Sequence, residues 1–196
     1  GASLAMALAL WLLADLGRLS ARVFLESGGA AAAALLVNVL LTRWLTLGQS
    51  DDWIASHWAA TLNAMPWLIL ALVQLYRMRL GGVLGWVRIA IATVAGLLAL
   101  VGIGLAVGPL NPVVGLIGPP EGLVRGPLVF DTLLLAYGLP GALLLAAFGR
   151  LGAIWRWLRL GIGALGCGLA ALYVALEIRR YWQGDDLWVP GAAPDP

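Results

Sequence analysis

The chain has 196 residues, of which 62% are hydrophobic and only 11% are charged, and its mean hydropathy is +0.94. A soluble domain carries about 25% charged and about 45–50% apolar residues, so this composition excludes an ordinary soluble domain, a disordered chain and a disulfide scaffold. All 12 basic residues are arginines and the net charge is +2; because the arginines lie at the ends of apolar runs, we expect no nucleic-acid partner.

The apolar runs have the length of membrane helices, which take about 20 residues each. We therefore predict an all-α fold, a polytopic transmembrane bundle of about six spans that forms a single integral membrane region. The spans are uniformly apolar, whereas the strands of a transmembrane barrel alternate between apolar and polar residues. In chain order, the expected spans cover residues 2–17, 30–47, 53–76, 83–107, 128–148 and 160–176.

Polar residues and helix breakers mark the connections between the first four spans. The charged stretch Asp15–Glu26 and the breaker Gly28-Gly29 separate the first two. Asp51-Asp52 precedes the third span and is well placed to cap its helix. The Gly- and Pro-rich connection 108–127 follows the fourth span. We expect it to lie on the head groups as an exterior loop, and a re-entrant loop within the bilayer is the alternative.

The last two spans carry features of helix bending and helix packing. Pro140 lacks a backbone N–H and its ring clashes with the carbonyl four residues earlier, so the fifth helix should be bent or broken there. We expect Tyr137 to point into the bundle. Small residues recur at every fourth position of the sixth span and predict a face for close helix packing within the bundle, with a dimer interface as the alternative. They are Gly163, Cys167, Ala171 and Ala175.

The arginines predict how the chain is threaded through the membrane. Eight of them lie at or beside the connections that follow the first, third and fifth spans: Arg18, Arg22, Arg77, Arg79, Arg88, Arg150, Arg156 and Arg159. The other four are Arg43, Arg125, Arg179 and Arg180. The positive-inside rule makes the first side cytoplasmic, so both ends of the chain are expected outside a bacterial inner membrane. The chain opens Gly-Ala-Ser, and we expect it to be a piece of a larger protein, partnered by the bilayer and by further helices of that protein.

Four charged residues near the first span, spaced by three and four, share one helix face. They are Asp15, Arg18, Arg22 and Glu26. We favour a helix that emerges into the cytoplasm and is stabilised by ion pairs along this face. The alternative is a polar lining for a water-filled path or an ion-coupled site. Asn38, Asn63 and Gln74 are expected to hydrogen-bond to neighbouring helices.

A second set of polar groups belongs to the expected outer face: Asp51, Asp52, His57 and Asp131. We interpret His57 as an interfacial residue among Trp53 and Trp58, and an exterior-facing proton relay or general base is the alternative. One His and one Cys cannot build a zinc site. Phosphate-loop and dinucleotide motifs are absent from the sequence. We therefore expect no metal and no cofactor, and favour a protein that is not an enzyme.

Two segments resemble recurring segments of a known family. Residues 131–141 (DTLLLAYGLPG) and 176–186 (LEIRRYWQGDD) are similar to those of a bacterial polytopic membrane-protein family, domain-of-unknown-function family twenty-three thirty-nine. The resemblance lies mainly in residues 127–188. It implies a protein with more helices than six, and it brings no activity, substrate or site residue.

Three functions remain open from the sequence. We favour a multi-pass inner-membrane component of transport or envelope maintenance without catalysis. The alternatives are a membrane-embedded enzyme for lipid-linked or cell-wall substrates at the outer face, and a structural or assembly partner in a membrane complex. Solvent-filled cavities at mid-bilayer would favour transport. Acids converging with His57 in an outer groove would favour the enzyme, and the absence of both patterns would favour the structural partner.

Overall fold

The structure, a computed structural model, describes residues 19–48, 56–78, 85–114, 124–152, 154–185 and 187. Within these ranges all regular structure is helical, which confirms the all-α prediction. The expected first span, residues 2–17, lies outside the described residues. The elements are α2 (Leu19–Gly48), α3 (His57–Met78), α4 (Gly85–Val107), the π-helical segment η2 (Leu134–Gly138), α5 (Leu139–Arg150) and α6 (Arg156–Gln183).

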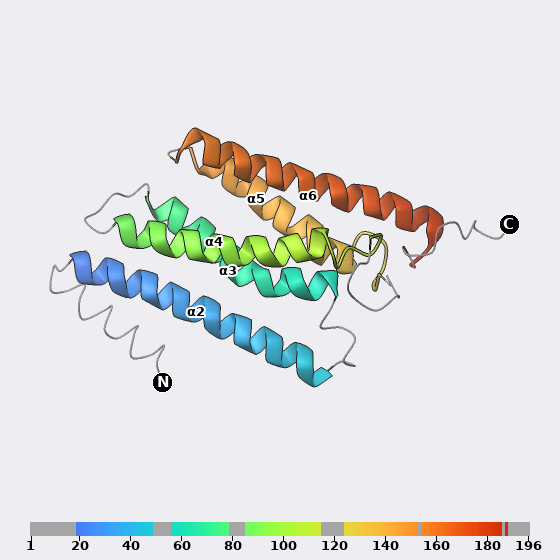
Figure 1. Ribbon diagram of the computed structural model, residues 1–196, viewed down its shortest axis with the longest axis horizontal. Coiled ribbons are helices and arrows are strands. Elements are labelled where there is room, and N and C mark those ends of the chain that lie inside the picture. The colour runs from blue at the N-terminus through green and yellow to red at the C-terminus, as the bar shows by residue number, and fades with distance from the viewer. Residues whose placement is uncertain are drawn as a thin grey trace.

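Consecutive helices run antiparallel, so their connections alternate between two ends of the bundle (Figure 1). We call one end the Asp131 end: there α2, α4 and α6 finish, and α3 and η2 begin. We call the other end the Trp155 end, where α3 joins α4 and α5 joins α6. Helix α3 is central, since it packs extensively against α4 and also contacts α2, η2 and α5, while α5 and α6 form a second closely packed pair.

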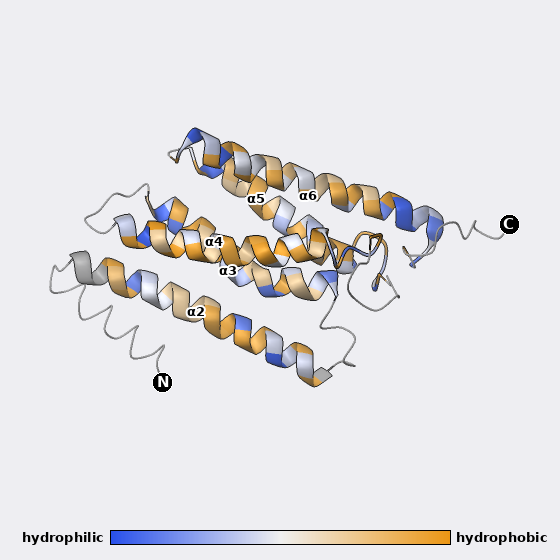
Figure 2. Cartoon of the chain, viewed as in Figure 1, coloured by the Kyte–Doolittle hydropathy of each residue, from blue (hydrophilic) through white to orange (hydrophobic). Residues whose placement is uncertain are grey.

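The helices have the length and surface of membrane spans. Four of them, Val23–Leu47 within α2 together with α3, α4 and α6, are long and apolar enough to cross a membrane, and Leu134–Arg150 is a shorter apolar helix. Hydrophobic side chains such as Leu97 and Val101 point outward from α4. On α6, hydrophobic residues fill the middle and hydrophilic residues gather towards the ends (Figure 2). An apolar surface this extensive suits lipid and would be a liability in water.

Helix α2 begins earlier than expected, and the predicted break at Gly28-Gly29 is wrong. The helix runs without interruption from Leu19 to Gly48. Glycine inside a helix costs about 1 kcal/mol relative to alanine, which does not end a helix unless the chain also leaves the helical conformation. Packing also holds this segment, because Ser27 is fully buried and its hydroxyl donates to Gln74 of α3 at 3.4 Å.

The expected interhelical hydrogen bonds are present between α2 and α3. The Asn38 side-chain amide donates to the Asn63 backbone carbonyl at 2.7 Å. The Thr42 hydroxyl donates to the Asn63 side-chain oxygen at 2.9 Å. Because lipid offers no hydrogen-bond partner to such groups, these contacts fix α2 on α3.

The interruption predicted around Pro140 is confirmed as a π turn. The Leu139 N–H donates to the carbonyl of Leu134, five residues back, and η2 leads directly into α5. A wider turn at this position accommodates a proline, which cannot donate and which crowds the preceding turn. Tyr137 is 0% exposed, so its predicted inward orientation is also confirmed.

Helix α6 extends further than the predicted span, which ended at residue 176. It continues to Gln183, so the charged segment after Leu176 is helical. Hydropathy detects the apolar part of a helix and not its polar continuation beyond the hydrocarbon. This extension brings Arg180 alongside the loop that precedes η2.

Candidate functional site

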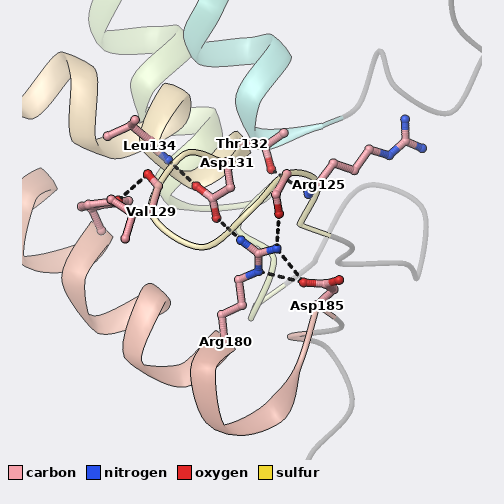
Figure 3. A network of polar contacts seen from close by, with 9 residues as sticks. Arg125, Val129, Asp131, Thr132, Leu134, Arg180 and Asp185 are labelled. Atoms are coloured by element: carbon pink, nitrogen blue, oxygen red, sulfur yellow. Dashed lines mark hydrogen bonds and ion pairs between the residues drawn. The ribbon is translucent and has the colours of Figure 1, made fainter.

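The most connected polar site lies at the Asp131 end, where the loop of residues 124–131 meets the end of α6 (Figure 3). We define the Asp131–Arg180 cluster as Asp131, Glu177, Arg180 and Asp185. Asp131 precedes η2, Glu177 and Arg180 lie on α6, and Asp185 follows that helix. The site thus joins residues that are up to 54 positions apart.

Arg180 is the centre of the cluster. Its Nη1 donates to Asp131 Oδ2 at 2.7 Å, while Nε and Nη2 donate to Asp185 Oδ1 at 2.9 and 2.6 Å. Nη2 also donates to the carbonyl of Gly126 at 2.6 Å. The Arg180 side chain is 5% exposed, that of Asp131 is 0% exposed and that of Asp185 is 61% exposed. The arginine therefore links a buried carboxylate to one at the surface.

Asp131 uses both of its carboxylate oxygens. Oδ1 accepts a hydrogen bond from the backbone N–H of Leu134 at 2.9 Å, which satisfies one of the donors left unpaired at a helix start. Oδ2 accepts from Arg180. Asp131 was predicted to belong to an outer-face group, and in the structure it caps a helix and pairs with α6 at once.

The loop is tied to α6 by its backbone as well. The Val124 N–H donates to the Asp185 carbonyl at 3.0 Å, and the Tyr173 hydroxyl donates to the Val129 carbonyl at 2.9 Å. Val129 has a φ of 75°, a conformation that a β-branched residue rarely adopts and that costs on the order of 1–3 kcal/mol. The contacts to α6 therefore hold the loop in a conformation that it would not adopt alone.

Glycine is required at position 126 of this loop. Gly126 has a φ of 113°, and a Cβ there would lie 2.8 Å from the carbonyl oxygen of Phe130. Its small size allows the loop to turn tightly and to present its carbonyl to Arg180. The backbone therefore contributes an acceptor to the cluster that no side chain could supply.

One atom of the cluster, Glu177 Oε1, has no hydrogen-bond partner within the described chain, and neither has His57 Nε2 of the nearby α3. His57 is 5% exposed and stacks on Tyr137, with 6.0 Å between ring centroids and 3° between planes. The ring of His57 thus packs inside the bundle at the start of α3, and its interfacial depth stays a prediction. Trp53 lies outside the described residues.

The structure brings together only part of the predicted outer-face group. His57 and Asp131 lie at the same end of the bundle, and Asp51 and Asp52 lie outside the described residues. Two residues of the predicted charged stripe, Asp15 and Arg18, also lie outside the described residues, and the structure does not describe the Arg22 side chain. Glu26 forms an ion pair with Arg77 of α3 at 3.4 Å.

The four small residues of the predicted packing face of α6 differ in their burial. Gly163 is buried, and a Cβ there would lie 2.8 Å from the Phe148 ring of α5. Cys167, Ala171 and Ala175 are exposed. Helix α5 instead approaches a neighbouring face, where a Cβ on Gly141 would lie 3.2 Å from the Gly166 carbonyl. Of the four residues, Gly163 therefore contacts α5, and close packing or a dimer interface at the other three stays a prediction.

Sequence reasoning missed Arg180, Glu177 and Asp185 as site residues. The available signal was their position in segment 176–186, one of the two segments that carry the family resemblance. Asp131 opens the other segment, and the ion pair of 2.7 Å joins the two. In the part of the chain that the structure describes, no group of three or more His, Cys, Asp or Glu residues is arranged to hold a metal ion.

A comparison with protein-family models matches residues 2–193 to the family described as "Predicted membrane protein (DUF2339)". The match extends well beyond the segment 127–188 in which the resemblance was first noted. No curated protein and no solved structure matches the chain.

Proposed function

The chain belongs to this family of membrane proteins, and we propose that it serves as a structural and assembly module of a larger membrane protein. In this role the Asp131–Arg180 cluster locks the loop before η2 onto the end of α6. One observation carries the proposal: groups of the chain itself bind both Arg180 and Asp131. Arg180 makes four hydrogen bonds to Asp131, Gly126 and Asp185, and both carboxylate oxygens of Asp131 are engaged.

This occupancy argues against a catalytic role for Asp131. A general base must reach the proton that it removes from a substrate. The Asp131 side chain is 0% exposed and is held by Arg180 and by the Leu134 N–H. A substrate could use this carboxylate only after the helix cap and the ion pair had been broken.

The contacts between helices likewise favour a structural role over transport. A transport path needs polar groups that face a water-filled cavity. The buried Ser27 and Gln74 side chains bond to each other, and Asn38 bonds to Asn63. A cavity of about 670 Å³ within the described chain is lined mostly by apolar side chains and lies towards the Trp155 end.

The arginines support a bacterial inner-membrane location with the Asp131 end outside. Five described arginines lie at or near the Trp155 end: Arg77, Arg88, Arg150, Arg156 and Arg159. Four lie towards the Asp131 end: Arg43, Arg125, Arg179 and Arg180. The positive-inside rule then makes the Trp155 end cytoplasmic. The exposed apolar faces of the bundle are available to further helices of the same protein and to lipid.

The test replaces the ion pair with leucines and asks whether the protein still works. Replacing both partners of a buried ion pair with apolar residues is often close to neutral for stability. We expect the double variant Asp131→Leu/Arg180→Leu to accumulate in the membrane and to complement a strain from which the gene has been deleted. The control is Arg179→Leu, because the hydrogen bond that Arg179 makes within the described residues is a local one, to Gln183 at 2.6 Å.

One result would contradict the structural role of the ion pair. A double variant that accumulates and melts like the wild type, yet fails to complement while Arg179→Leu succeeds, would show that the charges act in chemistry or coupling. The structural proposal would then be wrong.

A further inference from the structure

Three consecutive apolar side chains project from the loop that precedes η2. Leu128, Val129 and Phe130 are 51%, 53% and 75% exposed, and we call them the Leu128–Phe130 tip. They were expected at the start of the fifth span, whereas in the structure they precede the helical residues, which begin at Thr132. A run of apolar side chains that the chain leaves uncovered is a candidate contact for a partner.

Backbone polar groups of the tip are paired within the chain. The Phe130 N–H donates to the Pro127 carbonyl at 3.1 Å. The Val129 carbonyl accepts from the Tyr173 hydroxyl of α6 at 2.9 Å. Non-helical backbone is tolerated at membrane depth only where its polar groups find partners other than lipid. The tip therefore combines outward apolar side chains with a backbone that is bonded to the protein.

The tip lies beside the last apolar turn of α6. Its carbonyl at Val129 is bonded to Tyr173, and the apolar run of α6 ends at Leu176, directly before Glu177. Val174 of the same turn is 52% exposed. The tip thus continues the exposed apolar surface of α6 at the level where that surface gives way to charged residues.

The neighbouring helices begin or end at this level. Gly138 lies against Tyr173, since a Cβ there would be 3.5 Å from the tyrosine ring. The adjacent Tyr137 stacks on His57 at the start of α3 and bonds to Ala106 in the last turn of α4. Helix α3 has 22 residues, and at about 1.5 Å per residue it is about 33 Å long. This length matches the hydrocarbon core of a bilayer, which is about 30 Å thick, so its first residue marks one edge of that core.

We propose that the Leu128–Phe130 tip inserts among the acyl chains of the leaflet at the Asp131 end. Lipid is the partner because the tip lies at the edge of the hydrocarbon and continues the apolar surface of α6. The loop is then held on one side by Arg180 and on the other by the bilayer. The inference rests on the membrane location of the bundle, and it holds whether or not the Asp131–Arg180 cluster acts only structurally.

The test measures the surroundings of single cysteines in the Cys167→Ser background. Phe130→Cys and Leu128→Cys place a label on the tip. Val174→Cys on α6 is the reference for lipid. Arg125→Cys is the matched reference for water, because Arg125 belongs to the same loop, is exposed and points away from the cluster (Figure 3).

Each variant carries an environment-sensitive fluorophore and is reconstituted into phosphatidylcholine vesicles. Melting curves in detergent establish that the labelled proteins are folded. Nitroxide groups on the acyl chains quench a label that contacts the hydrocarbon, and iodide on both sides of the membrane quenches a label that contacts water.

We expect nitroxide lipid to quench the label at Phe130 as strongly as the label at Val174, and iodide to quench mainly the label at Arg125. The label at Leu128 should behave like that at Phe130. Quenching of the two tip labels by iodide and not by nitroxide lipid would overturn the proposal. Protection of both tip labels from both quenchers would also overturn it, because protein rather than lipid would then cover the tip.

Discussion

The Tyr137 hydroxyl joins η2 to α4 by a single buried hydrogen bond. The side chain is 0% exposed, and its hydroxyl donates to the Ala106 carbonyl at 2.7 Å. Ala106 lies in the last turn of α4, where backbone carbonyls have no partner within the helix. Tyr137→Phe keeps the ring that stacks on His57 and removes only this hydrogen bond.

The expected loss of stability follows from that geometry. Leaving a buried acceptor without its donor costs about 1–3 kcal/mol, and water does not reach this contact because Tyr137 and Ala106 are both 0% exposed. For a chain of this size, 1 kcal/mol shifts the melting temperature by roughly 2–4 °C. We therefore expect Tyr137→Phe to melt about 2–12 °C below wild type in detergent.

Tyr173→Phe is the matched comparison. The Tyr173 hydroxyl also donates to a backbone carbonyl, that of Val129 at 2.9 Å, but the bond is exposed. Water or head groups can replace it, so the melting temperature should fall less than for Tyr137→Phe. Equal melting of wild type and Tyr137→Phe would refute the assignment of this hydroxyl as a cap for α4.

Three further predictions concern helix packing, the loop and the threading of the chain. Gly163→Leu should lower the melting temperature much more than Ala171→Leu, because a Cβ at Gly163 would lie 2.8 Å from the Phe148 ring whereas Ala171 is exposed; equal tolerance would mean that Gly163 does not face α5. Gly126→Ala should lower the melting temperature, since the φ of Gly126 is 113° and the added Cβ would lie 2.8 Å from the Phe130 carbonyl oxygen. The control is Gly28→Ala inside α2, where a Cβ would meet nothing within 4 Å. This control should be neutral or stabilising by up to about 1 kcal/mol. A wild-type melt for Gly126→Ala would show that the loop relaxes freely. In a Cys167→Ser background, a membrane-impermeant thiol reagent should label Asp52→Cys and not Gly152→Cys in intact cells, and the reverse pattern would invert the proposed orientation.

The sequence was sufficient for features that depend on local chemistry. Apolar length located the described spans, and the missing N–H of Pro140 located the irregular turn of the fifth helix. The inward Tyr137 was expected beside that turn, and hydrogen bonds from Asn38 and Asn63 to neighbouring helices followed from the cost of leaving polar groups in lipid. The start of α2 did not follow, because a glycine pair weakens a helix without ending it.

The sequence did not predict the Asp131–Arg180 cluster or the helix faces that pack together, for two physical reasons. In a chain that is 62% hydrophobic, residues facing lipid and residues facing other helices are equally apolar, so periodicity does not identify the inner face. For this reason the spacing of Cys167 and Ala171 did not show that α5 leaves them exposed. The pairing of Asp131 with Arg180 joins residues 49 positions apart, and only the arrangement of helices shows it.

The most direct test of the structural role of the cluster is a double-mutant cycle on its buried ion pair. Melting temperatures in detergent are compared for wild type, Asp131→Leu, Arg180→Leu and the double variant. Removing one partner of a buried pair typically costs about 3–5 kcal/mol, because the other charge is left uncompensated, while removing both is close to neutral. We predict that each single variant melts far below wild type and that the double variant recovers most of the loss. A single Asp131→Leu variant as stable as wild type would contradict the account, because Arg180 would then not need this carboxylate to hold the fold.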